Sequence, residues 1–252
     1  MKKKERKSRY LEYEKKLNKA YVNLKSAYRE IKDSYTDMIF RFALAAEFKD
    51  DSTGTHLVRI ADYSTAIAEE MKFPKREITM LRYASLMHDV GKLILPDEIL
   101  KKKGGLTPLE RDVVKKHTTL GADIFSGSSS ALLRSAREVI LTHHERYDGT
   151  GYPRGLKKND IPLPGRIVAL ADVFDALTSK RPYKDAYGFD ESVEIISSES
   201  GRHFDPKVVR AFLKRKESIR EIWSATKAID TFIDEEHIEP HGHGPRRWIE
   251  RV

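Results

Sequence analysis

The chain has 252 residues, of which 34% are charged and 39% are hydrophobic, and its formal net charge is +8. No apolar run is long enough to cross a bilayer, and no apolar segment near the start resembles a signal peptide. Cysteine is absent, which excludes disulfides and thiolate ligands and fits a cytoplasmic protein. We therefore expect no membrane association, and any metal site must use histidine, aspartate or glutamate.

Much of the excess positive charge lies in two lysine-rich runs, at residues 2–7 and 101–103. A basic protein suits a phosphate-rich partner such as a nucleic acid, a nucleotide or an anionic membrane. A solvated lysine-rich surface explains these runs better, because no nucleic-acid-binding motif or interleaved aromatic residue accompanies them. We expect no nucleic acid partner.

Residues 1–48 contain neither glycine nor proline, which predicts one long helix. Its apolar residues alternate spacings of four and three: Leu17, Tyr21, Leu24, Tyr28, Ile31, Tyr35 and Met38. This heptad pattern favours a coiled coil that joins two copies and transmits a signal. Tyrosines at three positions weaken the case for a plain leucine-zipper-like coiled coil, and the alternative is a helix that lies on its own domain. We expect a homodimer through this helix, regulated by an upstream sensor domain or a regulatory protein, in a fragment of a longer protein or a small stand-alone enzyme.

The rest of the chain also predicts helices, because no stretch shows the alternation of a strand and no internal repeat is present. Thr107, Pro108 and Glu110 form a typical helix start, and Asp205 with Pro206 forms another. We expect an all-α fold in three parts: the helix of residues 1–48, a catalytic domain of residues 49–216, and a C-terminal helix with a mobile tail in residues 217–252. We expect the tail to be irregular after about residue 230, and its histidines to have no function. These are His237, His241 and His243.

The most informative stretch is residues 143–153, HHERYDGTGYP. Imidazoles and carboxylates are common metal ligands, and Gly149 and Gly151 allow a tight loop to lie close to a ligand. Tyr152 adds an aromatic face and a hydroxyl group. Taken alone, the stretch could equally be a polar loop after a helix.

Two further segments carry similar chemistry. His88 and Asp89 end a predicted helix, and Gly91 and Lys92 follow within a short turn. Asp172 lies in a helix that is apolar nearly all round, where a carboxylate costs several kcal/mol unless it is paired or binds a cation.

Seven residues are thus candidate ligands: His56, His88, Asp89, His117, His143, His144 and Asp172. A hydrogen-bonded core histidine, or an Asp172 paired with arginine, would explain any one of them but not all seven together. Seven ligands exceed the needs of one ion, and a carboxylate that bridges two ions about 3.5–4 Å apart is the usual solution. Asp89 is our candidate bridge. Nitrogen and oxygen ligands suit manganese, iron, cobalt, nickel or zinc.

Together these motifs resemble the HD phosphohydrolase superfamily, and residues 143–153 and 172–179 resemble its HD-GYP branch. The resemblance covers about residues 40–216. It implies an all-helical HD-type bundle around a two- or three-metal centre, often of iron or manganese. It also implies a cyclic di-GMP phosphodiesterase, which opens the cyclic dinucleotide to linear pGpG and in some members continues to GMP.

Carried over by position, the resemblance implies that His56, His88, Asp89 and Asp172 hold one ion. The second ion would share Asp89 and add the remaining three candidates, His117, His143 and His144. Lys92 matches the lysine that touches the substrate phosphate, and Tyr152 and Arg181 match positions close to the phosphate or base. Three-metal members carry a glutamate where this chain has Ser52, so we expect two ions, and the final product stays open between pGpG and GMP.

The expected mechanism uses Asp89 and Lys92 as catalytic residues. Two cations would lower the pKa of a bridging water, whose hydroxide attacks phosphorus while Lys92 and Arg181 stabilise the negative charge. One alternative is an HD-type hydrolase of another nucleotide, such as a nucleotide monophosphatase or an alarmone hydrolase, although such relatives generally lack the loop of residues 151–153. The other is a catalytically weak cyclic dinucleotide sensor, against which the intact ligand set argues.

Overall fold

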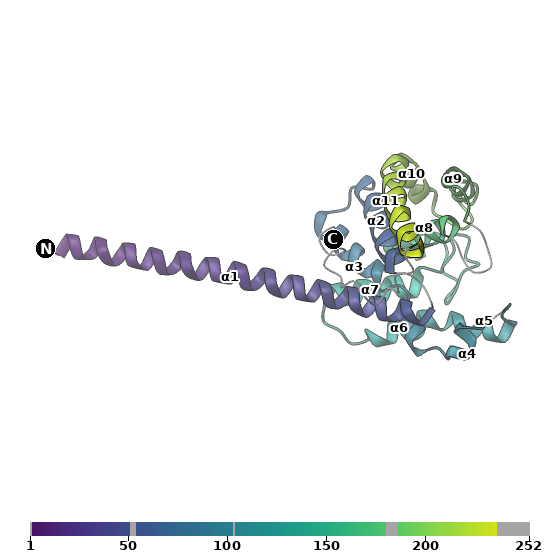
Figure 1. Ribbon diagram of the computed structural model, residues 1–252, viewed down its shortest axis with the longest axis horizontal. Helices are drawn as coiled ribbons and strands as arrows, with labels where there is room; N and C mark the ends of the chain where they lie inside the picture. The colour runs from purple at the N-terminus through teal and green to yellow at the C-terminus, as the bar shows by residue number, and fades with distance from the viewer. Residues whose placement is uncertain (1, 51–53, 103, 180–185, 236–252) are drawn as a thin grey trace.

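A long helix, α1 (Lys2–Glu47), projects from a bundle of shorter helices in the computed structural model (Figure 1). The structure describes residues 2–50, 54–102, 104–179 and 186–235. In these residues no β-strand forms, and one isolated bridge pairs Ser200 with Phe204. The predicted all-α fold and the long N-terminal helix are therefore confirmed. Among the described helices, none combines the length and apolar character that crossing a membrane requires.

The two ends of α1 lie in different environments. Most of its length stands clear of the bundle, and Leu17, Leu24 and Ile31 of the heptad stripe are 71%, 69% and 69% exposed. Its last turns enter the core, where Phe40 and Ala43 are buried. Packing on the chain's own domain, the alternative to a coiled coil, thus occurs only at this end. The division at residues 48 and 216 stays a prediction.

The bundle is built from short helices with brief connections. In chain order they are η1 (Phe48–Asp50), α2 (Gly54–Glu70), α3 (Lys75–Leu86), η2 (Val90–Ile94), α4 (Asp97–Leu100), α5 (Pro108–Lys115), α6 (His117–Ile124), α7 (Ala131–Thr142), η3 (Lys158–Asp160), α8 (Leu163–Thr178), α9 (Phe189–Ser198), α10 (Pro206–Lys214) and α11 (Lys216–Glu235). Helices α2, α3, α7 and α8 pack successively against one another, and α6 packs against α7 and η2. Helix α8 is apolar nearly all round, as expected, and Ile167, Leu170 and Phe174 are fully buried.

Two predicted helix starts are confirmed by their caps. Thr107 and Glu110 form a capping box at α5, in which each side chain accepts a hydrogen bond from the other residue's backbone N–H. Asp205 caps α10 by accepting a 2.7 Å hydrogen bond from the backbone N–H of Lys207. Helix α11 continues to Glu235, beyond residue 230, where irregular structure was expected. The tail of residues 236–252, with its three histidines, lies outside the described residues.

A close backbone contact aligns two of the predicted ligand segments. Gly91, in η2, lies against the start of α6, and a Cβ atom at Gly91 would come within 1.8 Å of the carbonyl oxygen of His117. Only glycine fits there without moving the backbone. The contact brings Asp89, two residues before Gly91, beside the imidazole of His117.

Candidate metal centre

The seven candidate ligands converge from five parts of the bundle. His56 comes from the start of α2, His88 and Asp89 from the connection between α3 and η2, His117 from the start of α6, His143 and His144 from the end of α7, and Asp172 from α8. They divide into two groups that could each hold a metal ion, the ligand atoms of each group lying within 4.8 Å of one another. The three-residue group is His56, His88 and Asp172, and the four-residue group is Asp89, His117, His143 and His144.

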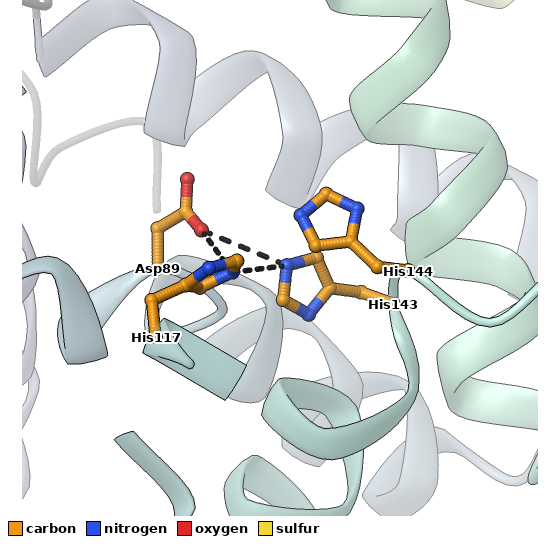
Figure 2. Close-up of side chains that lie close together, drawn as sticks. All are labelled: Asp89, His117, His143 and His144. Atoms are coloured by element: carbon orange, nitrogen blue, oxygen red, sulfur yellow. Dashed lines mark hydrogen bonds and ion pairs between the residues drawn. The ribbon is translucent and has the colours of Figure 1, made fainter. Parts of the chain in front are cut away.

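Asp89 lies between the two groups. Its Oδ1 is 3.2 Å from Nε2 of His117 and 3.6 Å from Nε2 of His143 (Figure 2). Its Oδ2 is 3.4 Å from Nε2 of His88, which belongs to the three-residue group. Because the two carboxylate oxygens approach different groups, Asp89 could contact an ion in each of them.

Backbone carbonyl groups orient three of the imidazoles. Nδ1 of His88 donates to the carbonyl of Ser85 at 2.8 Å, and Nδ1 of His117 donates to that of Val114 at 2.8 Å. Nδ1 of His143 is 3.0 Å from the carbonyl oxygen of Ile140. A carbonyl oxygen only accepts, so each Nδ1 carries a proton, and whenever the ring is neutral its lone pair lies on Nε2. This is the arrangement that metal-binding histidines commonly show.

The Nε2 atoms then face one another without enough donors. Those of His117 and His143 are 3.3 Å apart. Nε2 of His88 and Oδ1 of Asp89 are buried, and neither has a hydrogen-bond donor in the described part of the chain. Facing lone pairs and a buried carboxylate are costly unless a cation or added protons lie between them. The residues therefore fit a divalent metal bound through nitrogen and oxygen.

A buried ion pair orients His56. Its Nδ1 lies 2.5 Å from Oδ2 of Asp175, and the guanidinium of Arg59 also binds that carboxylate. Arg59 further donates to Ser179 at 3.0 Å. Burial alone would raise the pKa of Asp175, but His56 and Arg59 hold it well below its usual range. Asp175 therefore remains ionised and turns the other nitrogen of His56 towards the centre.

The electrostatic surroundings of the imidazoles differ between the groups. Burial opposes protonation of His88, yet the negative charges of Asp89, Asp172 and Glu47 raise its pKa to about 9. His143 and His144 have lowered pKa values, because burial dominates and neighbouring imidazoles add to it.

Lys92 and Tyr152 border the four-residue group. Nζ of Lys92 is 2.8 Å from Oδ2 of Asp89. Burial would raise the pKa of Asp89, but Lys92 and then His88 hold it well below its usual value. The Tyr152 ring stacks on His144 with 4.8 Å between centroids. Arg181, the other residue expected to bind substrate, lies outside the described residues.

The loop that carries Tyr152 is fixed by a buried acid. Glu145 is 2% exposed and accepts hydrogen bonds from the backbone N–H groups of Arg154, at 2.8 Å, and Leu156, at 2.9 Å. At Gly151 the chain passes so close that a Cβ atom would lie 2.3 Å from the backbone nitrogen of Arg146. These contacts hold the loop against the end of α7.

Sequence reasoning gave no role to Asp175, Arg59 or Glu145. A signal existed for Asp175, because it lies in the same apolar helix as Asp172 and carries the same cost of burial. For Arg59 and Glu145, no local pattern in the sequence indicated which groups they would bind.

Comparison with solved structures supports the same fold. A crystal structure of a cyclic GMP-AMP-specific phosphodiesterase of Vibrio cholerae matches with a TM-score of 0.57 at 21% sequence identity. The match covers 78% of this chain and 51% of that chain.

Comparison of sequences gives nearer relatives. The chain is 42% identical over 223 residues to a Thermotoga maritima protein named cyclic di-GMP phosphodiesterase, covering 87% of this chain and 61% of that protein. It is 40% identical over 185 residues to a Vibrio cholerae serotype O1 protein named 3′3′-cGAMP-specific phosphodiesterase 2, covering 73% of this chain and 35% of that protein. The chain thus spans only part of each relative's length. The family model of the HD domain matches residues 42–208, and the chain belongs to the HD domain family.

Proposed function

We propose that this chain is a metal-dependent phosphodiesterase that hydrolyses cyclic di-GMP to linear pGpG. The observation that carries the proposal is the position of Asp89, whose two oxygens approach two separate groups of buried ligands. Relatives named cyclic di-GMP phosphodiesterases, at 42% and 38% identity, support the choice of substrate.

The seven ligands would hold two divalent ions, with iron or manganese favoured and nickel, cobalt or zinc also compatible. Such ions supply an activated water and a positive field for the anionic phosphodiester. Asp89 and the imidazoles would determine the positions of the two ions. No further acid is expected from residue 52, which is serine and lies outside the described residues.

Lys92 and Tyr152 would act on the substrate. The ammonium of Lys92 lies at the bridging carboxylate, where it can stabilise negative charge on the phosphate as the bond to the 3′ oxygen breaks. The ring of Tyr152 offers a face for a guanine base beside His144. A contact between Arg181 and the substrate stays a prediction.

A second substrate, 3′3′-cGAMP, follows from the relative that is named for it. It differs from cyclic di-GMP in one base and has the same phosphodiester chemistry. A hydrolase of another nucleotide is therefore the alternative that the comparisons favour over a catalytically weak sensor.

The test is hydrolysis by the purified chain under anaerobic conditions with Mn²⁺ or Fe²⁺. Cyclic di-GMP and 3′3′-cGAMP are incubated separately, and the products are separated by chromatography. We expect pGpG from cyclic di-GMP, and any GMP that accumulates will show whether the second step occurs. Faster cleavage of 3′3′-cGAMP would move the proposal to that substrate, and metal binding without cleavage of either would leave a sensor.

We also propose that two copies pair through α1. The exposed stripe repeats every seven residues, so the same stripe on a second copy is its natural complement. Light scattering should give twice the monomer mass, and Leu24→Glu should reduce it while Lys25→Glu, outside the stripe, should not. An upstream sensor or regulatory protein acting through α1, and a cytoplasmic location, stay predictions.

A further inference from the structure

A buried acid that the proposed chemistry does not use lies at the end of α1. Glu47 is the last residue of that helix and is 1% exposed. Neither of its carboxylate oxygens has a hydrogen-bond partner among the residues that the structure describes. An ionised carboxylate buried in this way costs several kcal/mol unless a positive charge compensates it.

The nearest lysine in sequence is directed elsewhere. Nζ of Lys49 donates to the carbonyl oxygens of Leu93, at 2.7 Å, and Leu95, at 2.6 Å. It also lies 3.3 Å from Asp97. These contacts attach the segment after α1 to η2, and they leave Glu47 to be compensated by another cation.

The end of α1 lies beside one half of the metal centre. It packs against η2, which directly follows His88 and Asp89, and against α2, whose first turn carries His56. His143 and His144 come instead from the end of α7. The buried acid is therefore on the side of the three-residue group, two of whose ligands are His56 and His88.

We propose that Glu47 is a positioning residue of the metal centre, whose negative charge strengthens cation binding at the three-residue group. That group contains one carboxylate, Asp172, besides the shared Asp89. A further acid held behind it by the fold raises the affinity for a divalent cation without contacting the substrate. Glu47 is the last residue of α1, so the helix that presents the exposed stripe also places this carboxylate beside the metal centre.

This inference rests on the proposed metal centre but not on the proposed substrate, so the test measures metal binding alone. Mn²⁺ is titrated calorimetrically into the metal-free full chain, comparing the native protein with Glu47→Gln. Glu138→Gln, which removes one charge from the exposed side of α7, is the matched control. We expect Glu47→Gln to weaken one binding step by about 10–100-fold, the usual effect of removing a group that supports the ligands, and Glu138→Gln to change neither step.

Three measurements assign the effect. In a His117→Ala background, which disables the four-residue group, the remaining step should be the one that Glu47→Gln weakens. Glu47→Asp, which keeps the charge, should recover most of the affinity. The melting temperature of metal-free Glu47→Gln should equal or exceed that of the native chain, since an uncompensated buried charge has been removed.

A structural role would give the opposite results. Unchanged Mn²⁺ affinity in Glu47→Gln, or an equal loss of affinity in Glu47→Asp, would overturn the proposal. So would a Glu47→Gln chain that fails to fold or melts lower without metal. None of these outcomes bears on cyclic dinucleotide hydrolysis, which the native chain tests separately.

Discussion

The two ligand groups of the centre are built from similar side chains but are prepared differently for a cation. In the three-residue group, acids surround the imidazoles, and the pKa values of His56 and His88 are raised. In the four-residue group Asp89 is the one acid among three imidazoles, and the pKa values of His143 and His144 are lowered, chiefly by burial.

The difference has a consequence for metal binding. A protonated histidine must release one proton before its ring can bind a metal ion. His143 and His144, whose pKa values are lowered, present neutral rings near pH 7, whereas His88, with a pKa of about 9, must release a proton. The acids around His88 offer negative charge in return. The two halves should therefore respond differently to mutation and to pH, although they share Asp89.

Removing the shared carboxylate should have the largest effect, because it affects both halves. Asp89→Asn keeps the shape of the side chain but removes the charge that lies between His88, His117 and His143. We expect hydrolysis to fall by at least about 10³-fold, the upper end of what one electrostatic contact contributes, and bound metal to fall as well. Product chromatography and elemental analysis measure the two losses. A fully metallated Asp89→Asn protein would show that the groups do not depend on a common bridge.

Replacing Lys92 should separate catalysis from metal binding. Lys92→Ala removes an ammonium that lies 2.8 Å from Asp89 but supplies no metal ligand. We expect about a 10²–10³-fold loss of rate with the metal content unchanged. Lys101→Ala, on the exposed surface, should retain the native rate. If Lys92→Ala hydrolyses at the native rate, Lys92 has no part in the mechanism.

The next effect should be confined to the three-residue group. Asp175→Asn removes the carboxylate that orients His56 and pairs with Arg59. We expect about 10–100-fold weaker binding of one Mn²⁺ ion and little change in the other. Breaking the buried pair should also lower the free energy of unfolding by about 3–5 kcal/mol, measured by denaturant titration. Equal weakening of both ions would mean that the halves are not separable in this way.

Asp175 also illustrates what could be read from the sequence. The candidate ligands stood out because histidines and aspartates lay at predicted helix ends or in an apolar helix, which are local signals. The partition into two groups was only implied by resemblance. It depends on how helices distant in the chain pack, as the pairing of Arg59 with Asp175, 116 positions apart, shows.

Glu47 was missed for a related reason. The heptad stripe correctly predicted a long helix, but the pattern does not reveal where along that helix the core begins. The structure shows α1 exposed at Ile31, whereas one face of its last turns, from Ile39 to Glu47, is buried. A charged residue near the end of such a helix is expected at its surface, and only the packing of α1 against η2 and α2 places Glu47 inside.

The smallest predicted effect is a two-sided dependence of the metal-free protein's stability on pH. The pKa of His88 is about 9 in the folded state against about 6.5 when unfolded, so its contribution is complete below pH 6.5 and is lost as pH rises towards 9. His143 and His144 have lowered pKa values, so the unfolded state binds more protons, and stability falls as pH drops below about 6.5.

The melting temperature in a chelator should therefore be highest near pH 6.5, with each kcal/mol lost on either side lowering it by about 2–4 °C. Scanning calorimetry between pH 5 and 9.5 measures the decrease of the melting temperature on both the acid and the alkaline limb of this pH profile. His88→Gln should flatten the alkaline limb and His144→Gln the acid limb, because each variant removes a titrating ring from one half of the centre. If both variants flatten the same limb, the two groups share one electrostatic environment, and the contrast between an acid-rich and an imidazole-rich half is wrong.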